Sequence, residues 1–255
     1  LDTTTTGTQN VGVGYGAMDA NTSGSNNTAV GDAALASNTT AVQNTAIGDD
    51  SLKLCTTGSY NTCLGFNSGV YTTAVVTGVK NVLIGAYTNA TATDADGAVV
   101  LGYAVSGAAQ YTTIGYGASD IRAAHGNITW ATVSDVRVKK DIEDSTVGLS
   151  FINDLRPVTF NYKNKGDLPK EFRGYEEGST EVYKNEKTQH GFIAQEVKSA
   201  IDKNSDIKNG FSMWDDDDDT GQQRVGETAL VPVLVKAIQE LSTQVDELKS
   251  ELIAL

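Results

Sequence analysis

The feature that most constrains this chain is a sequence repeat with a period of 17 residues. Seven glycines each end a near-copy of the phrase Asn-Thr-Ala-Val-Gly. They are Gly14, Gly31, Gly48, Gly65, Gly85, Gly102 and Gly115. The interval is 17 residues in four of the six steps, 20 before Gly85 and 13 before Gly115. Because repeats of this length stack as successive coils that contact only their neighbours, an elongated solenoid is expected.

Each copy of the phrase is expected to form a short strand. The residue before the glycine is aliphatic in every copy, and the residue two positions earlier is Val or Thr. Alternate residues of a strand share a face, so these two columns lie on one side. We expect the aliphatic column to face inward: Val13, Val30, Ile47, Leu64, Ile84, Leu101 and Ile114. A second column, four residues after the glycine, predicts a second short strand in each coil: Met18, Leu35 and Leu52.

Glycine and asparagine mark the turns of each coil. The repeated glycine is expected to adopt a backbone conformation that residues with a Cβ avoid. The asparagine that starts most copies fits either a turn or a ladder of side chains. Cys63 occupies the position of Ala29 and Ala46 in neighbouring copies, so a small buried thiol is expected there. Two cysteines are too few for a disulfide framework.

The composition changes abruptly near residue 133. All glutamates and all three prolines lie after it, whereas 18 of the 26 glycines lie before it. We therefore expect β-roll repeats over residues 1–120, a linker over 121–133 and a differently built domain over 134–255. The formal net charge of −13 is spread over both halves without a basic stripe, which argues against nucleic acid as a partner.

Neither a membrane span nor a metal or other cofactor site is expected. The chain has no run of 18 apolar residues, and its first residues lack the basic and apolar stretches of a signal peptide. Because it does not begin with Met, a fragment of a longer protein is expected. The acidic run at 215–219 lacks the spaced ligands and glycine of a calcium-binding loop, so it is interpreted as a solvated loop.

The thin core of the repeats favours association between chains. A coil of this size encloses little more than Ala, Val, Ile and Leu, and so small a core is marginal by itself. The outer faces also carry apolar residues that chains packed side by side would bury. Residues 10–117 resemble the left-handed β-roll repeats of trimeric autotransporter adhesin heads and of some phage tail fibres, which implies a homotrimer. A monomeric β-solenoid is the alternative.

Four stretches stand out after residue 133. They are 134–142 (Ser-Asp-Val-Arg-Val-Lys-Lys-Asp-Ile), 155–162 (Leu-Arg-Pro-Val-Thr-Phe-Asn-Tyr), 190–197 (His-Gly-Phe-Ile-Ala-Gln-Glu-Val) and the tail from 229 to 255. In this order they resemble the C-terminal intramolecular chaperone domain of phage endosialidase tailspikes and many tail fibres. The resemblance implies that residues 134–255 drive trimer assembly and then cut themselves off.

The resemblance also implies the chemistry of that cut. Ser134 is the expected nucleophile, Lys139 the base, and the bond between Val133 and Ser134 the one that breaks. Such a Ser–Lys dyad would act once on its own chain and turn over no external substrate. Supporting residues are expected among Asp135, Arg137, Gln195 and Glu196, although the last two equally fit the exposed face of a short helix over 192–200. His190 is interpreted as a turn or packing residue rather than part of a triad.

The spacing of the two catalytic residues sets a geometric condition. A serine hydroxyl needs a base, and a lysine is a base only when neutral, so its pKa must fall from about 10.4 towards about 7. Burial beside cations such as Arg137 and Lys140 is one way to lower it. A separation of five residues puts Ser134 and Lys139 on different faces of a helix or a strand. Either a turn between them or a Lys139 from a neighbouring chain is required.

The tail has the clearest periodicity of the second half. Apolar residues recur there at alternating spacings of three and four, with Val or Ile mostly at a and Leu at d. They are Val231, Leu234, Ile238, Leu241, Val245, Leu248, Leu252 and Leu255. This pattern predicts a coiled-coil helix; β-branched a residues with Leu at d nominally favour two strands, but the resemblance implies three, which we expect. A single packed helix is the alternative.

These patterns together predict the C-terminal part of a phage tail fibre or tailspike. A mainly β half, a trimeric roll, would precede an α+β chaperone domain that ends in a coiled-coil helix. The protein would be assembled in the host cytoplasm, reside in the virion, and bind a host-cell receptor such as a glycan. One alternative is a non-cleaving trimeric surface adhesin with a permanent coiled-coil foot. A glycan-degrading enzyme is the other, but residues 1–133 show no paired carboxylates for it.

Overall fold

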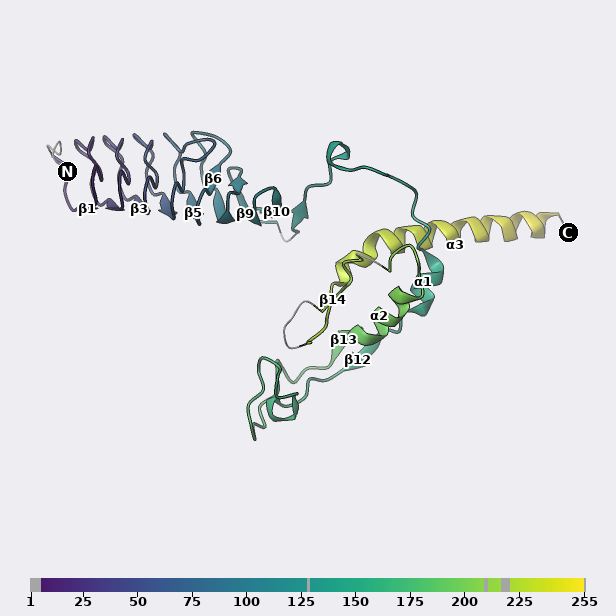
Figure 1. The fold of residues 1–255 in the computed structure, drawn as a ribbon. Coiled ribbons are helices and arrows are strands. Elements are labelled where there is room, and N and C mark those ends of the chain that lie inside the picture. Colours follow the sequence, from purple (N-terminus) through teal and green to yellow (C-terminus); the bar gives the residue numbers. More distant parts are fainter. Residues whose placement is uncertain (1–5, 128, 209–210, 217–220, 255) are drawn as a thin grey trace. The chain divides into compact units, whose positions relative to one another are not determined.

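The structure is a computed structural model that describes residues 6–127, 129–208, 211–216 and 221–254. The chain divides into two compact units, Leu1–Lys140 and Asp141–Leu255, which are described separately (Figure 1). The first unit is a β-solenoid and the second is a small α+β domain that ends in a long helix. The predicted fold class is therefore confirmed.

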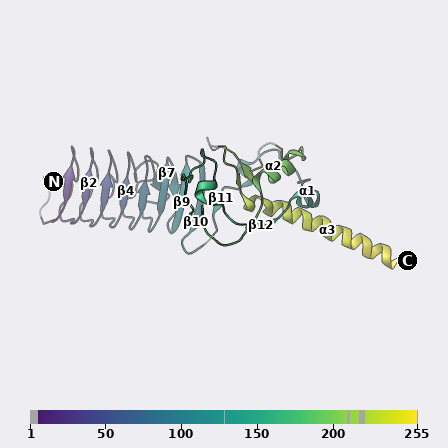
Figure 2. The same cartoon turned by 90° about the horizontal axis from the view of Figure 1, so that it is seen from below.

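One sheet of nine strands runs along the first unit, as the row of arrows in Figure 2 shows. Seven strands, one per coil, pair in parallel with their neighbours. They are β1 (Val11–Val13), β2 (Thr28–Val30), β3 (Thr45–Ile47), β4 (Thr62–Leu64), β5 (Val82–Ile84), β7 (Val99–Tyr103) and β9 (Tyr111–Tyr116). The repeat period thus equals one turn of the solenoid, since Thr28 pairs with Thr45 and Thr45 with Thr62.

The sheet ends in two antiparallel strands, which begin two residues before the predicted linker of residues 121–133 and continue into it. The strand β10 (Ser119–Ala124) folds back along β9, and β11 (Ala131–Thr132) pairs with β10. In β11, Thr132 lies opposite Ile121, so paired structure continues to the residue before Val133. These strands cover the edge of the last parallel coil.

The predicted orientation of the aliphatic column is wrong. In β2 to β5 the middle residue faces the interior, and Ala29, Ala46, Cys63 and Leu83 are fully buried, as is Val100 of β7, which pairs with Leu83. The column predicted to face inward lies on the outer side of the sheet, with Val13 56% exposed, Ile47 38% and Ile84 37%. In the first coils these inner residues are small, and Met18, Leu35 and Leu52 supply the large buried side chains, whereas later coils place Leu83 and Val100 at the inner position of the strand.

The second column does face inward, but it does not form the strand predicted for each coil. Met18, Leu35 and Leu52 are completely buried. Their φ angles of 53°, 55° and 52° lie in the left-handed region, so the backbone turns there instead of extending. A second strand occurs only in later coils, where β6 (Asn89–Ala90) pairs in parallel with β8 (Ser106–Gly107).

A ladder of buried asparagines joins each coil to the next, as one of the two sequence interpretations proposed. The Oδ1 of Asn44 accepts a hydrogen bond from the backbone N–H of Asn61 at 2.8 Å, and its Nδ2 donates to the carbonyl of Gly58 at 2.8 Å. The same pattern repeats for the column Asn10, Asn27, Asn61 and Asn81. These bonds satisfy turn backbone that the strands leave unpaired.

The repeated glycine has the predicted special conformation. At Gly48, φ is +130°, and a Cβ would lie 2.5 Å from the carbonyl oxygen of Gly65 in the next coil. The close stacking of the coils therefore needs a residue without a side chain there. Cys63 is fully buried and burial raises its pKa to about 12, which fits the predicted inert thiol.

Short elements surround one small core in the second unit. They are α1 (Leu149–Asp154), β12 (Val158–Phe160), the 3₁₀ turn η2 (Lys165–Asp167), β13 (Gln189–Gly191), α2 (Ala194–Asp202), β14 (Trp214–Asp215), β15 (Arg224–Val225), the 3₁₀ turn η3 (Glu227–Ala229) and α3 (Leu230–Ile253). Phe151, Val197, Met213 and Val233 are buried together in this core. Among the described residues, no helix has the length and apolar character needed to cross a bilayer.

The long helix α3 carries two apolar faces. Leu230, Val233 and Ala237 are buried against the core of the unit. The heptad residues lie on exposed surface, from 42% for Leu234 to 73% for Leu252. The helix is as predicted, and its heptad face is Val231, Leu234, Ile238, Leu241, Val245, Leu248 and Leu252; Leu255 lies outside the described residues. Packing against the unit therefore does not account for the heptad pattern.

The asparagine ladder predicts a large effect of a single truncation. In Asn44→Ala, the N–H of Asn61 loses its partner inside the solenoid, and the carbonyl of Gly58 keeps only the thiol of Cys55 as a weak donor. An unsatisfied buried group costs about 1–3 kcal/mol, so the free energy of unfolding should fall by about that amount or more. Denaturant unfolding measures the loss, and amide exchange should accelerate at Asn61.

Gln43→Ala is the matched control for this prediction. Gln43 precedes Asn44 in the same turn, but its side chain is exposed. Equal destabilisation by the two variants would show that the buried hydrogen bonds contribute little to the stacking of the coils.

Candidate functional site

Ser134 and Lys139 are brought together within one chain. The Nζ of Lys139 donates a hydrogen bond to the Oγ of Ser134 at 2.8 Å. Between them lies the 3₁₀ turn η1 (Val136–Val138), which reverses the chain over three residues. This arrangement corresponds to the first of the two sequence alternatives, a turn between the residues, and it requires no lysine from another chain.

The side chain of Asp135 holds this turn closed. Its Oδ1 accepts the backbone N–H of Arg137 at 2.9 Å, which is the usual contact of a helix N-cap. The guanidinium of Arg137 binds the same carboxylate through Nε at 2.9 Å and Nη2 at 2.6 Å. These side-chain bonds, together with the bond from the backbone N–H, lower the pKa of Asp135 below its ordinary value.

The same contacts change the expected role of Arg137. Because its guanidinium is paired with Asp135, its charge is largely compensated beside the dyad. The sequence interpretation used Arg137 as a cation that would help to deprotonate the lysine. Its described contacts instead support the shape of the turn.

The dyad lies on an exposed stretch rich in aliphatic side chains. Ser134 and Lys139 are both exposed. Val133 is 55% exposed, Val136 and Val138 are each 68% exposed, and Ile142 is 65% exposed. A single chain therefore presents the side chains of Ser134 and Lys139 to water, together with apolar surface that would favour burial.

The other predicted supporting residues belong to the second unit. Gln195 and Glu196 lie in the first turn of α2 and are exposed, consistent with the alternative interpretation of that segment. Glu196 accepts a hydrogen bond from the Nε of Arg156 at 3.0 Å, and this pairing lowers the pKa of Glu196. His190 pairs through the backbone with Thr159 between β12 and β13. None of these described contacts assigns a catalytic role to them.

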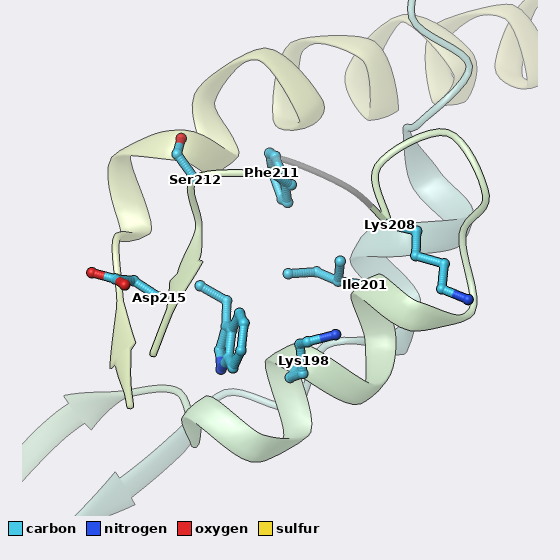
Figure 3. Close-up of a pocket in the computed structure, with 7 residues that line it drawn as sticks. Lys198, Ile201, Lys208, Phe211, Ser212 and Asp215 are labelled. Atoms are coloured by element: carbon cyan, nitrogen blue, oxygen red, sulfur yellow. The ribbon is translucent and has the colours of Figure 1, made fainter. Parts of the chain in front are cut away.

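A hollow of about 610 Å³ in the second unit was not predicted from the sequence. Figure 3 shows Ile201 and Phe211 on its apolar wall, with the Lys198 side chain below them and Asp215 pointing away. The Nζ of Lys198 lies 5.0 Å from the centre of the Trp214 ring. The residues that line the hollow come in part from α2 and from the strand β14. No local sequence motif indicates that these two segments lie close together. The predicted catalytic residues are not part of it.

The structure offers no metal site in the part of the chain that it describes. No three His, Cys, Asp or Glu side chains gather there in a way that could hold an ion. Within the acidic run, Asp215 belongs to β14, whereas Asp217–Asp219 lie outside the described residues.

Comparison with known proteins assigns a family to the segment that begins at this serine. Residues 134–205 match the model of the Peptidase S74 family, described as chaperone of endosialidase. No curated protein and no solved structure is significantly similar to the chain. The match starts at Ser134 and includes the turn, α1, β12, β13 and α2. Behind its β-solenoid, the chain thus carries a domain of the chaperone-of-endosialidase family.

Proposed function

We propose that this chain is the C-terminal part of a phage tail fibre or tailspike that folds as a homotrimer and then releases its own chaperone domain. The cut falls between Val133 and Ser134, with Ser134 as nucleophile and Lys139 as base. The observation that carries the proposal is the 2.8 Å contact between these side chains at the first residue of the family match. The fibre part would remain in the virion and contact the host receptor.

The position of the serine determines the first chemical step. Ser134 lies on the C-terminal side of the bond, so its Oγ attacks the carbonyl carbon of Val133 as the hydroxyl proton passes to neutral Lys139. The C–N bond breaks, and the nitrogen of Ser134 takes that proton from the lysine. The product of this step is an ester between Val133 and the Oγ of Ser134.

Water completes the cut by hydrolysing the ester. The water oxygen bonds to the Val133 carbon, and Oγ regains a proton as the ester bond breaks. Val133 is left with a carboxylate and Ser134 with a free amine. Because the new N-terminus belongs to the released domain, the reaction occurs once per chain, and no metal, cofactor or external substrate takes part.

Assembly supplies what a single chain lacks. A lysine ammonium loses its proton near neutral pH only when it is desolvated, but this stretch is exposed in one chain. The apolar side chains of Val133, Val136, Val138 and Ile142 are surface that neighbouring copies would cover. The dyad is therefore complete in each chain but becomes active when three chains assemble.

The heptad face of α3 supports the trimer. Its seven apolar residues form a regular exposed row, whereas a different face of the helix packs on its own unit. Such a row is the seam through which helices associate. A non-cleaving adhesin with a permanent coiled-coil foot would use the same seam, so the cleavage itself separates the two functions.

The first prediction from this proposal concerns the cut. The wild-type chain should yield a fragment that begins at Ser134, and Ser134→Ala and Lys139→Ala should each remain intact. For Lys139→Ala, loss of a general base should slow the cleavage by at least about 10²-fold. Intact-mass measurement identifies the bond. Ser150→Ala and Lys170→Ala, at exposed positions of the second unit, are matched controls that should cleave normally.

Mixed assemblies test whether the dyad lies within one chain. Ser134→Ala and Lys139→Ala chains folded together should remain uncut, because neither contains both groups. Cleavage in the mixture would mean that the lysine acts on a neighbouring serine. An uncut wild-type chain that nevertheless forms trimers would favour the adhesin.

The N-cap gives a second prediction. Asp135→Ala should slow cleavage more than Asp135→Asn, because Asn still accepts the Arg137 N–H whereas Ala opens the turn. Since the folded pKa of Asp135 is lowered, its contribution to the turn is present above the ordinary Asp pKa of about 3.9 and is lost as the pH falls through the lowered value. Amide exchange at Arg137, measured against pH, should report this opening.

Equal cleavage rates for Asp135→Ala and Asp135→Asn would show that the N-cap does not contribute to cleavage. Asp144→Ala is the control, since that exposed carboxylate follows the turn without capping it. It should cleave at the wild-type rate.

The third prediction concerns the seam. Ile238→Asp should convert trimers to monomers, because each buried Ile contributes about 1.5–3 kcal/mol and a carboxylate is costly to bury. Sedimentation or light scattering gives the mass. Gln239→Asp adds the same charge at the neighbouring position and should remain trimeric. Cleavage should fall together with trimer content, and efficient cleavage by a monomeric Ile238→Asp chain would contradict activation by assembly.

A further inference from the structure

A row of aromatic side chains runs over the last four parallel coils, beside the glycine column. Phe66, Tyr103 and Tyr116 each directly follow their glycine, and Tyr87 follows Gly85 by two residues. Neighbouring ring centres along this line lie 5.1, 5.2 and 5.7 Å apart. Backbone hydrogen bonds fix the line, since the N–H of Tyr87 donates to the carbonyl of Phe66 in the preceding coil at 2.9 Å. The stacking of the coils therefore gathers these rings into one continuous row.

Two irregularities of the repeat each add a ring to this aromatic row. Ala86 occupies the position after Gly85, and Tyr87 supplies the ring from the next position. The φ of Tyr87 is 59°, in the left-handed region that a bulky residue rarely adopts, and the equivalent positions of the other coils hold Gly, Ala, Asp or Asn. The 20-residue step before Gly85 contributes Tyr71, whose ring centre lies 4.8 Å from that of Tyr87. Because backbone strain of this kind clusters at ligand sites, it points to a binding role for the row.

Contacts between the coils leave much of the ring surface open. Tyr116 is 72% exposed, Tyr71 54%, Tyr103 44% and Phe66 41%. The half-buried ring of Tyr87 meets those of Phe66 and Tyr103 at interplanar angles of 85° and 84°, so these rings touch edge to face. A contiguous exposed aromatic patch is typical of an interaction site.

The charges around the row disfavour a polyanionic partner. From residue 66 to 116 the chain carries three charged residues, Lys80, Asp94 and Asp96, and all three precede a strand, at the end away from the row. In the coil before the row, the position after the glycine holds Asp49, which is exposed. Nucleic acids and acidic polysaccharides bind cationic grooves, whereas here they would meet a carboxylate on a chain with a net charge of −13. The partner that fits this surface is therefore uncharged.

A neutral sugar chain matches the chemistry of the row. Sugar rings have apolar C–H faces that pack on aromatic faces, and hydroxyl groups that need hydrogen-bond partners. Four of the five side chains are tyrosines, which combine an apolar face with a hydroxyl and lose little conformational entropy on binding. The carboxylate of Asp49 at one end can accept hydrogen bonds from sugar hydroxyls. Because rings repeat from coil to coil, a linear oligosaccharide contacts more of the row than a single sugar does.

We propose that the aromatic row is a binding site for a linear, neutral glycan of the host surface. The proposal rests on the host attachment in the proposed function and names its site and the class of its ligand. The rings pack against the apolar faces of successive sugars, while the tyrosine hydroxyls and Asp49 bind sugar hydroxyls. The row lies entirely before residue 133, so it stays with the solenoid whether or not the chain is cut.

Binding to defined oligosaccharides tests this site. The protein is applied to an array of linear oligomers of glucose, galactose, mannose and N-acetylglucosamine, with oligomers of sialic acid and galacturonic acid as the acidic set. The wild type should bind within the neutral set and not to the acidic set. Tyr116→Ala and Tyr103→Leu should each weaken binding about tenfold, because each removes one aromatic face. Tyr60→Ala is the matched control, since Tyr60 is 53% exposed but precedes its strand, away from the row, and it should bind like the wild type.

Several results would overturn the site: no binding to any neutral oligomer, preference for the acidic set, or an equal loss in Tyr60→Ala. Light scattering and intact mass are measured on the same variants. Loss of the trimer in Tyr116→Ala and Tyr103→Leu would identify the row as a contact between chains, which also overturns the proposal.

The same measurements separate this site from the proposed function. Trimers of Tyr116→Ala and Tyr103→Leu that are cut normally and bind glycan like the wild type would overturn the site and leave the trimer and the cut standing. Glycan binding through the row by an uncut monomer would contradict the trimer and the cut instead. Tyr103→Leu keeps apolar bulk in β7, so it preserves the comparison if Tyr116→Ala folds poorly.

Discussion

Each coil of the solenoid is tied to the next through the buried asparagine at the start of its strand. The side chain accepts from a backbone N–H in the following coil and donates to a turn carbonyl, so the turns have hydrogen-bond partners without water. Glycine at the other end of the strand then lets the coils approach closely. Together they fix a narrow coil, in whose first turns small inner strand residues such as Ala29 and Ala46 share the interior with the large side chains of Leu35 and Leu52. The remaining aliphatic residues have to lie outside.

The sequence predicted the parts of this fold that depend on local chemistry. The period located the seven parallel strands of the solenoid, the glycine column indicated the special backbone conformation at their ends, and the heptads predicted the helix α3. Which face of each strand points into the solenoid was not predictable in this way. Alternation shows which residues share a face, but it does not show which face is buried. Hydrophobicity favoured Ile47 over Ala46 as the inner residue, yet the width of the coil selected Ala46. That width is a property of the closed coil, and no single repeat reveals it.

The contacts around the candidate site also divide into those between near neighbours in the sequence and those between residues far apart in the chain. Spacing alone left open whether Ser134 meets Lys139 through a turn or through another chain. The deciding feature is Asp135, whose side chain accepts the backbone N–H of Arg137 two residues later. An aspartate just before a helical turn is a capping signal that can be read from sequence. The pairing of Glu196 with Arg156, and the contact of Lys198 with the ring of Trp214, join residues far apart along the chain. Such contacts depend on tertiary packing that one sequence does not encode visibly.

Both units of the chain expose apolar surface. The solenoid leaves Ile47 and its equivalents outside, α3 leaves its heptad face outside, and the segment of the dyad leaves Val136 and Val138 outside. A chain built in this way is poorly protected alone, and its parallel coils depend on contacts between residues far apart in sequence, which form slowly. A helical seam made of local contacts can associate first and hold the chains in register while the coils form. In the proposed trimer the seam is no longer needed once the solenoids are packed, and the proposed cut would leave a fibre that cannot readily retrace its folding route.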